Sequence, residues 1–198
     1  MFIKSHNLHK LLITSYGVST FSEGFLMPIY AIFVQGIGGD ILEASAAISI
    51  FLLVSGLTTI FIHRSAWSEK HRVKLLVYGW LLWAIGIGGY FFIVDTYTLF
   101  AVQVIVALGN AIADPAFSAE LDDNINKNKK SYSWGVFQGI QDIANSIAAI
   151  AGGLIASLFG FRVLIAFMFA TATLSFLIIL YYVKIKNRNW LDKLIHNN

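Results

Sequence analysis

The sequence predicts an all-α membrane protein with six transmembrane helices. Of its 198 residues, 57% are hydrophobic and only 13% are charged, and the mean hydropathy is +0.70. These values lie far outside the range of soluble domains. The apolar residues also gather into six runs, and a helix needs ~20 such residues to cross the core of a bilayer. Six spans with short loops use nearly the whole length, so no room remains for a separate soluble domain.

The basic residues predict the orientation of these runs. Of the 14 Lys and Arg residues, two precede the first run, four follow the second, three follow the fourth and four follow the sixth. Only Arg162 lies on the opposite side. Because basic loops stay in the cytoplasm, both termini are expected to be cytoplasmic, in a bacterial or archaeal inner membrane. Basic loops that face anionic lipid also explain the pI of about 9.1, so the bilayer and not nucleic acid is the expected partner.

Each run is assigned in chain order. We place the spans at 10–36, 41–63, 72–93, 97–120, 133–157 and 162–184. All must be helical, because lipid offers the backbone no hydrogen-bond partner. Residues 1–184 are therefore predicted to form one transmembrane bundle. Residues 185–198 are predicted to form a basic cytoplasmic tail that lies on the membrane surface as a short amphipathic helix, with a frayed tail as the alternative.

Polar residues follow a single face of three predicted helices. The first span carries Tyr16, Thr20, Glu23, Met27 and Tyr30, the fourth carries Gln103, Ala107, Asn110 and Asp114, and the fifth carries Gln138, Gln141, Asp142 and Asn145. Spacings of three and four residues place each set on one side of its helix. Because a carboxylate that faces lipid is costly, we expect the three faces to line one hydrated cavity.

The three carboxylates in these faces are the candidates for proton coupling. We expect Glu23 and Asp142 to be the leading groups and Asp114 to be the third, since ionisable residues inside membranes mark ion and substrate pathways. The alternative is that each one is protonated and ties the bundle together through hydrogen bonds. The first interpretation gives the carboxylates a role in transport, and the second gives them a role only in the stability of the bundle.

Small residues recur at every fourth position in the fifth span and, more weakly, in the second. In the fifth span Ala144, Ala148 and Gly152 follow one such stripe and Gly153 belongs to a parallel one, and the second span has a weaker version in Ser45, Ser49 and Gly56. Such stripes let membrane helices approach closely. We predict that they form a contact between two copies of the chain. Packing within one bundle is the alternative.

The motifs of soluble enzymes are not found in the sequence. It has no phosphate-binding loop ending in Gly-Lys-Ser/Thr and no cysteine, so thiolate metal sites and disulfides are excluded. His6 and His9 could share a metal, but a solvated terminus explains them better. We therefore expect no enzyme activity, no cofactor and no metal site, and any active transport must be driven by a gradient of an ion or solute.

Four stretches resemble the major facilitator superfamily of transporters. A likeness to the first helix and first outer turn of that family is found in the stretch FSEGFLMPIYAIFVQGIGGDILEAS, which resembles them. Its charged signature between helices two and three is resembled by WSEKHRVKLLVYGW, in which Glu69, Lys70, Arg72 and Lys74 stand for the acidic and basic residues that join helix ends. Two further stretches resemble helices four and five of the family, in this order: GNAIADPAFSAELDD and GVFQGIQDIANSIAAIAGGLIASLFGFR. The proline of the family's antiporter motif is missing from the fifth span, so antiport is not inferred.

The resemblance implies one half of a major-facilitator fold. Members usually have twelve helices, in two six-helix halves related by an axis along the membrane normal. Two copies of this chain can pair in the same way, as a parallel homodimer. We therefore predict a secondary transporter of a small solute that is proton-coupled and works as a homodimer by alternating access. The alternatives are a non-transporting scaffold or assembly protein, a passive pore, and a fragment of a twelve-helix transporter.

Overall fold

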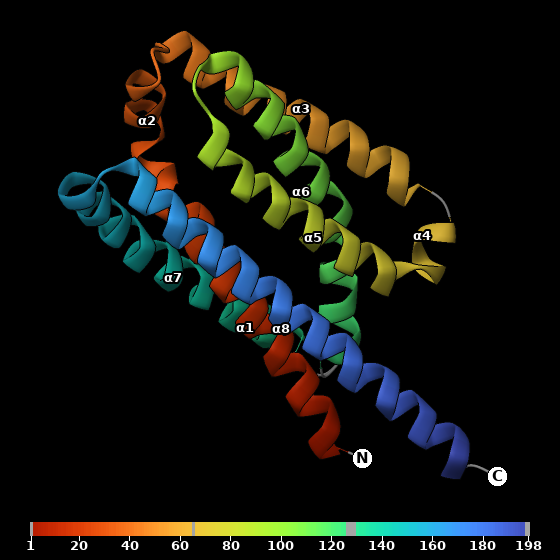
Figure 1. The fold of residues 1–198 in the computed structure, drawn as a ribbon. Coiled ribbons are helices and arrows are strands. Elements are labelled where there is room, and N and C mark those ends of the chain that lie inside the picture. The colour runs from red at the N-terminus through yellow and green to blue at the C-terminus, as the bar shows by residue number, and fades with distance from the viewer. Residues whose placement is uncertain (1, 65, 126–129, 197–198) are drawn as a thin grey trace.

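The computed structural model describes residues 2–64, 66–125 and 130–196, and these residues form a bundle of helices (Figure 1). In chain order the elements are α1 (Phe2–Leu26), η1 (Met27–Ile29), α2 (Tyr30–Gly36), α3 (Ile41–His63), α4 (Ala66–Lys70), α5 (Arg72–Gly89), η2 (Tyr90–Phe92), α6 (Thr96–Asn124), α7 (Lys130–Phe159) and α8 (Phe161–His196). Within the described residues, six helical segments are long and apolar enough to cross a membrane. The predicted number of spans is confirmed.

The first span is bent, whereas the sequence predicted one helix over 10–36. A short 3₁₀ turn, η1, separates α1 from α2, and Figure 1 shows α2 turning away from the line of α1. Pro28 lies in this turn. A proline ring has no N–H to donate and clashes with the carbonyl four residues earlier, which interrupts an α-helix.

The other predicted boundaries lie close to the observed ones. Asp40 begins α3 with a capping box, in which its carboxylate accepts from the N–H of Glu43 at 3.0 Å and Glu43 accepts from the N–H of Asp40 at 2.8 Å. Asp95 begins α6 in the same way with Thr98, and this hydrogen bond from the backbone lowers the pKa of Asp95. These caps satisfy N–H groups that the first turn of a helix leaves open.

The six spans divide into two groups of three. One group consists of α3, α5 and α6, and the other consists of α1, α7 and α8; contacts of α5 with α8 and of α1 with α6 join the two groups. Figure 1 shows the first group beside the second, with α5 and α8 running along each other. The polar faces of α1 and α6 are therefore brought together at the junction between the groups.

Two of the spans are largely uncovered. Only 6% of the most apolar stretch of α3 and 17% of that of α7 is buried inside the bundle. The corresponding share is 50% for the spans that contain α5 and α6. Both helices expose rows of large apolar side chains, such as Leu53 and Leu57 on α3 and Ile147 and Leu154 on α7. Their outer faces are available to lipid or to another protein.

The small-residue stripe of α7 corrects part of the predicted dimer contact. A Cβ added to Gly152 would lie 2.0 Å from the carbonyl oxygen of Phe25, so α7 and α1 meet at backbone distance there. Ala144 and Ala148 are buried on the same side of α7. These three residues pack within the chain, because a stripe that closes an internal helix contact is no longer accessible to a second copy.

The remaining members of the predicted dimer contact face outward. A Cβ added to Gly56 or Gly153 would meet no atom of the described residues within 4 Å. Ser45 and Ser49 are exposed on α3. This part of the contact stays a prediction.

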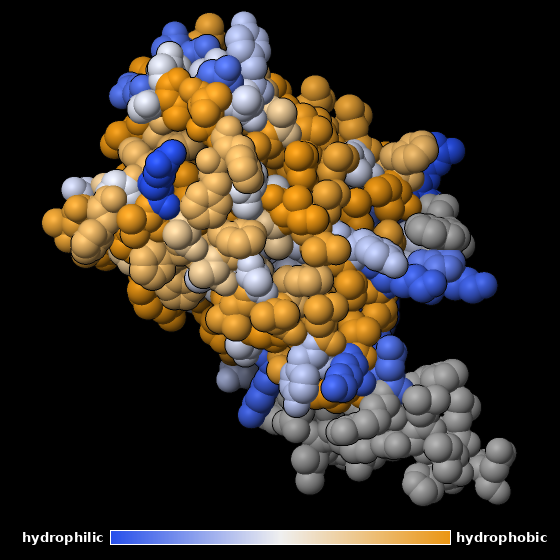
Figure 2. All heavy atoms as spheres, viewed as in Figure 1, coloured by the Kyte–Doolittle hydropathy of each residue, from blue (hydrophilic) through white to orange (hydrophobic). Residues whose placement is uncertain are grey.

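The surface of the bundle fits a bilayer. Figure 2 shows a broad hydrophobic band, with most hydrophilic side chains at the two ends of the molecule. The last helix, α8, continues without a break from the predicted sixth span to His196. The side chains of residues 188–198 lie outside the described part, so the amphipathic character of the tail stays a prediction.

Candidate functional site

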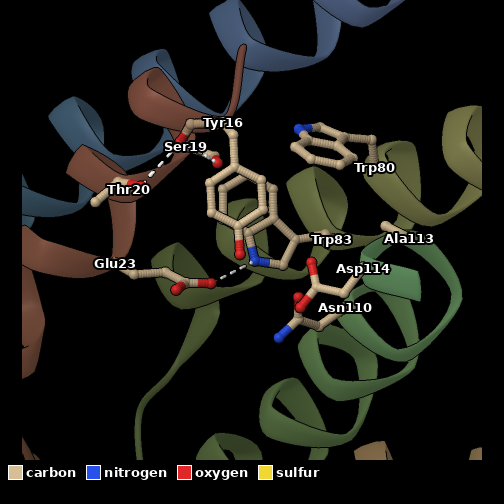
Figure 3. Close-up of a pocket in the computed structure, with 9 residues that line it drawn as sticks. All are labelled: Tyr16, Ser19, Thr20, Glu23, Trp80, Trp83, Asn110, Ala113 and Asp114. Carbon is tan, nitrogen blue, oxygen red and sulfur yellow. Dashed lines mark hydrogen bonds between the residues drawn. The ribbon is translucent and has the colours of Figure 1, made fainter. Parts of the chain in front are cut away.

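A small polar pocket lies where α1, α5 and α6 meet (Figure 3). It is lined by Tyr16, Ser19, Thr20, Glu23, Trp80, Trp83, Asn110, Ala113 and Asp114. Its volume is about 30 Å³, and a water molecule needs roughly 10–15 Å³ of such space. The pocket can therefore hold one or two waters or a proton, but not a solute.

Glu23 is held at one side of this pocket by an indole. The Nε1–H of Trp83 donates to Oε1 of Glu23 at 3.1 Å. Trp83 itself is only 4% exposed, whereas Glu23 is exposed. A Cβ added to Gly109 of α6 would lie 2.3 Å from the backbone nitrogen of Trp83, so the glycine lets α5 approach α6 at backbone distance. This close approach fixes the indole opposite the carboxylate of α1.

Asp114 lies on the other side of the pocket, together with Asn110 one turn earlier on α6. With its amide nitrogen turned toward the carboxylate, Asn110 donates to both oxygens of Asp114, at 3.1 and 2.9 Å. In the view of Figure 3 the hydroxyl of Tyr16 lies between the carboxyl groups of Glu23 and Asp114. The three groups thus face the same small space.

Aromatic rings close the pocket around Tyr16. Its ring lies 4.6 Å from that of Phe117, 5.3 Å from that of Phe137 and 6.0 Å from that of Trp80, centroid to centroid. Such rings lower the local dielectric constant beside the pocket, which strengthens the repulsion between charges. No basic side chain is among the described residues that line the pocket. Two ionised carboxylates would therefore repel each other here, and one added proton relieves that repulsion.

A second polar cluster joins three helices at the end of the bundle where the basic loops lie. Glu120 of α6 is 1% exposed. It accepts from Nε of Arg72 on α5 at 2.8 Å, and also from the hydroxyl of Tyr182 and from Nζ of Lys186 on α8. Arg72 pairs in addition with Asp123. A buried carboxylate that binds two cations ties the ends of α5, α6 and α8 together.

Comparison with known proteins identifies the fold family. The Major Facilitator Superfamily profile matches residues 12–193. The chain belongs to this family. Among its relatives is the proton-coupled antiporter flippase LtaA of Staphylococcus saprophyticus, which is 25% identical over 170 residues, or 82% of this chain and 42% of the relative. The protein of the same name from Staphylococcus epidermidis is 30% identical over 88 residues, or 44% of this chain and 22% of the relative. The chain spans less than half the length of these relatives.

Within this major-facilitator bundle, the structure brings together five of the residues that the sequence placed in a cavity. They are Tyr16, Thr20, Glu23, Asn110 and Asp114. Tyr30 is not among the residues that line the pocket, and its hydroxyl accepts from Nε2 of Gln103 at 2.6 Å. The grouping of the first and fourth spans was predictable, because each carries its polar residues on one face.

The polar stripe of α7 does not reach this pocket. Asp142 is exposed, and its Oδ1 accepts from Nε2 of Gln138 on the same helix at 3.3 Å. Gln141 and Asn145 are also absent from the pocket lining among the described residues. The structure therefore places Glu23 and Asp114 at one pocket and leaves Asp142 exposed on α7. The part that the α7 stripe plays stays a prediction.

Of the four residues in the predicted charged motif, mainly one takes part in the polar cluster around Glu120. Arg72 reaches the buried Glu120, whereas Glu69 is 73% exposed and lies 3.6 Å from Arg72. Lys70 and Lys74 are exposed. Sequence reasoning missed Glu120 as a site residue, although a carboxylate at the last position of a predicted span was a usable signal.

Trp83 and Lys186 were also missed. Nothing in the sequence distinguishes a tryptophan that donates to a carboxylate from one that packs in the core. The partner of Lys186 lies 66 residues away in sequence, so only the fold shows the pair.

Proposed function

We propose that this chain forms one six-helix half of a proton-coupled secondary transporter, with Glu23 and Asp114 as the groups that bind the coupling proton. The observation that carries the proposal is that two carboxylates from different helices face one water-sized pocket whose described lining contains no cation. The names of the relatives, which are proton-coupled antiporters, support the same coupling ion.

The residues around the two carboxylates have distinct roles in this proposal. Trp83 donates to Glu23 and holds its carboxylate toward the pocket, while Asn110 does the same for Asp114. In this proposal the hydroxyl of Tyr16, which lies between the two carboxyl groups in the view of Figure 3, would relay a proton from one to the other. Because Glu23 is exposed in the six-helix bundle whereas Asp114 is not, Glu23 would exchange the proton with water in an open cavity, and Asp114 would retain it.

Protonation can then bias the conformation of the transporter. A bound proton shifts an equilibrium between two states only by the difference in its affinity for them. A conformation that encloses the carboxylates favours the protonated pair, and one that opens them to water favours loss of the proton. Alternating access would thus be linked to the proton gradient.

The solute needs a larger cavity than the pocket of about 30 Å³ offers. In this family the solute site lies between two six-helix halves. The uncovered faces of α3 and α7 are where a second half would fit, and we propose that a second copy of this chain supplies it in a parallel homodimer. Gly56 and Gly153, where an added Cβ would meet no described atom, lie on these faces.

Reconstituted liposomes with an internal pH-sensitive dye test the proposal. A panel of candidate solutes is offered under an imposed proton gradient, and solute-dependent proton flux is expected for the parent chain. Glu23→Gln should abolish this flux, because glutamine keeps the size and hydrogen bonding of glutamate but cannot titrate. Asp122→Asn, which removes a carboxylate at the exposed end of α6 and outside the pocket, is the matched control and should retain it.

Two results would count against the proposal. Proton-linked flux in Glu23→Gln equal to that of the parent would show that this carboxylate is structural. A parent chain that moved neither protons nor any solute of the panel, while remaining folded, would favour the scaffold alternative.

A further inference from the structure

A second, much larger hollow opens between α5 and α8 at the end of the bundle that the charge pattern predicts to be cytoplasmic. Its volume is about 500 Å³, which is within the range of small-molecule sites. It is bordered by α4, the first turns of α5 and residues 183–187 of α8. These three helical segments lie at the same end of the bundle in Figure 1. The proton pocket between α1, α5 and α6 shares no lining residue with it.

The hollow is lined by an excess of cations. Four basic side chains, Lys70, Arg72, Lys74 and Lys186, line it together with only two carboxylates. Arg72 and Lys186 are engaged by the buried Glu120. By contrast, neither Lys70 nor Lys74 forms an ion pair with any residue in the described part of the chain. The two lysines are therefore available to an anion that enters the hollow.

The start of α5 adds to the positive potential. This helix begins at Arg72, within the lining of the hollow, and the side chain of its N-cap residue, His71, forms no capping hydrogen bond. The first N–H groups of a helix carry partial positive charge and attract phosphate. The basic side chains and the backbone N–H groups thus both favour an anionic ligand in the hollow.

An apolar path leads from the hollow toward the middle of the membrane. Val77 and Val183 form apolar parts of its wall, and Tyr78 is 62% exposed. Leu81 and Ile85 follow Tyr78 on the same face of α5 and are 38% and 54% exposed. Residues three and seven positions apart lie on one side of a helix, so an exposed apolar strip runs down α5 below the cationic hollow.

We propose that this hollow binds the headgroup of an anionic phospholipid of the cytoplasmic leaflet. The phosphate would be held by Lys70 and Lys74, and an acyl chain would lie along Tyr78, Leu81 and Ile85. Basic pockets between transmembrane helices on the cytoplasmic side are suited to such headgroups. The apolar strip favours a lipid over a free phosphate, since a small anion would use only the cations. The bound lipid would also cover the junction of α5 and α8 that the Glu120 cluster holds together.

The test measures lipid binding to the purified protein in nonionic detergent by native mass spectrometry. Phosphatidylglycerol and phosphatidylcholine of matched chain length are titrated separately, and phosphatidylglycerol is expected to bind at least tenfold more tightly. Lys70→Gln with Lys74→Gln should weaken phosphatidylglycerol binding about thirtyfold, the factor expected from two basic residues near an anionic headgroup. Lys10→Gln with Lys184→Gln removes the same charge at the same end of the bundle but outside the hollow, and should leave binding within about threefold of the parent.

Further arms distinguish the possible sources of the anion. Inorganic phosphate and glycerol phosphate are offered as competitors, and neither should displace the lipid at millimolar concentration. Leu81→Asn with Ile85→Asn should weaken phosphatidylglycerol binding while leaving the four cations in place. Equal weakening by both lysine pairs, equal binding of the two lipids, or displacement by inorganic phosphate would each overturn the proposal.

Discussion

Replacing Gly152 by alanine tests whether α1 and α7 meet where the structure places them. The added Cβ would lie 2.0 Å from the carbonyl oxygen of Phe25 and 2.7 Å from its carbonyl carbon and Cα. Since Cβ contacts shorter than 3.0 Å are essentially never observed, and these atoms belong to backbone, the two helices must separate by about 1 Å. A gap of that size forfeits a quarter to a half of the local dispersion energy, and overpacking of this kind costs about 1–3 kcal/mol.

Thermal unfolding followed by intrinsic tryptophan fluorescence measures this cost. The chain has five tryptophans and no cysteine, so the signal needs no label. For a protein of this size, 1–3 kcal/mol corresponds to a decrease in Tm of about 2–12 °C. Gly139→Ala on the same helix is the matched control, because its Cβ would meet no described atom within 4 Å, and its Tm should stay within about 1 °C of the parent. Equal Tm values for the two variants would refute the helix contact.

Three further predictions concern the site, the charged cluster and the proposed dimer. Trp83→Phe removes the donor to Glu23 and should lower proton-linked flux about tenfold, the factor that corresponds to the loss of one hydrogen bond to a charged group. Flux equal to that of the parent would show that the indole does not position Glu23 for proton coupling. Glu120→Gln leaves two cations without their carboxylate and should destabilise the bundle by about 2 kcal/mol in thermal unfolding. The loss is expected to fall below the ~3–5 kcal/mol of a fully buried pair, because the two basic partners are 21% and 34% exposed. Gly56→Trp on the outer face of α3 should disrupt the dimer in cross-linking within bilayers without changing the fold of one copy, and an unaltered dimer would place the contact elsewhere.

The number, order and approximate ends of the spans could be predicted from the sequence, because hydrophobic runs and basic loops reflect the bilayer directly. The bend at Pro28 was missed: a hydropathy run shows the length of a span but not its continuity. The 3₁₀ turn there follows from a local property of proline that the run conceals.

The candidate site was predictable only in part. Periodicity placed Glu23 and Asp114 on polar faces, but it could not show which faces meet. The same reasoning grouped Asp142 with them, although in the structure α7 turns Ala144, Ala148 and Gly152 toward α1 and leaves Asp142 exposed. The helix α7 carries one stripe of small residues and one stripe of polar residues, and only one of them can face α1. The small residues face it, because they allow the two backbones to pack closely.

The most direct test is infrared difference spectroscopy of the carboxyl groups between acid and alkaline pH, in protein reconstituted into lipid. If Glu23 and Asp114 share the coupling proton, the parent should show a protonated carboxyl band that shifts in deuterium oxide and disappears at alkaline pH. Glu23→Gln should remove or displace this band, Asp114→Asn should change its pH dependence, and Asp122→Asn, outside the pocket, should preserve it. A band that survived unchanged in both Glu23→Gln and Asp114→Asn would contradict the assignment of the proton to this pair.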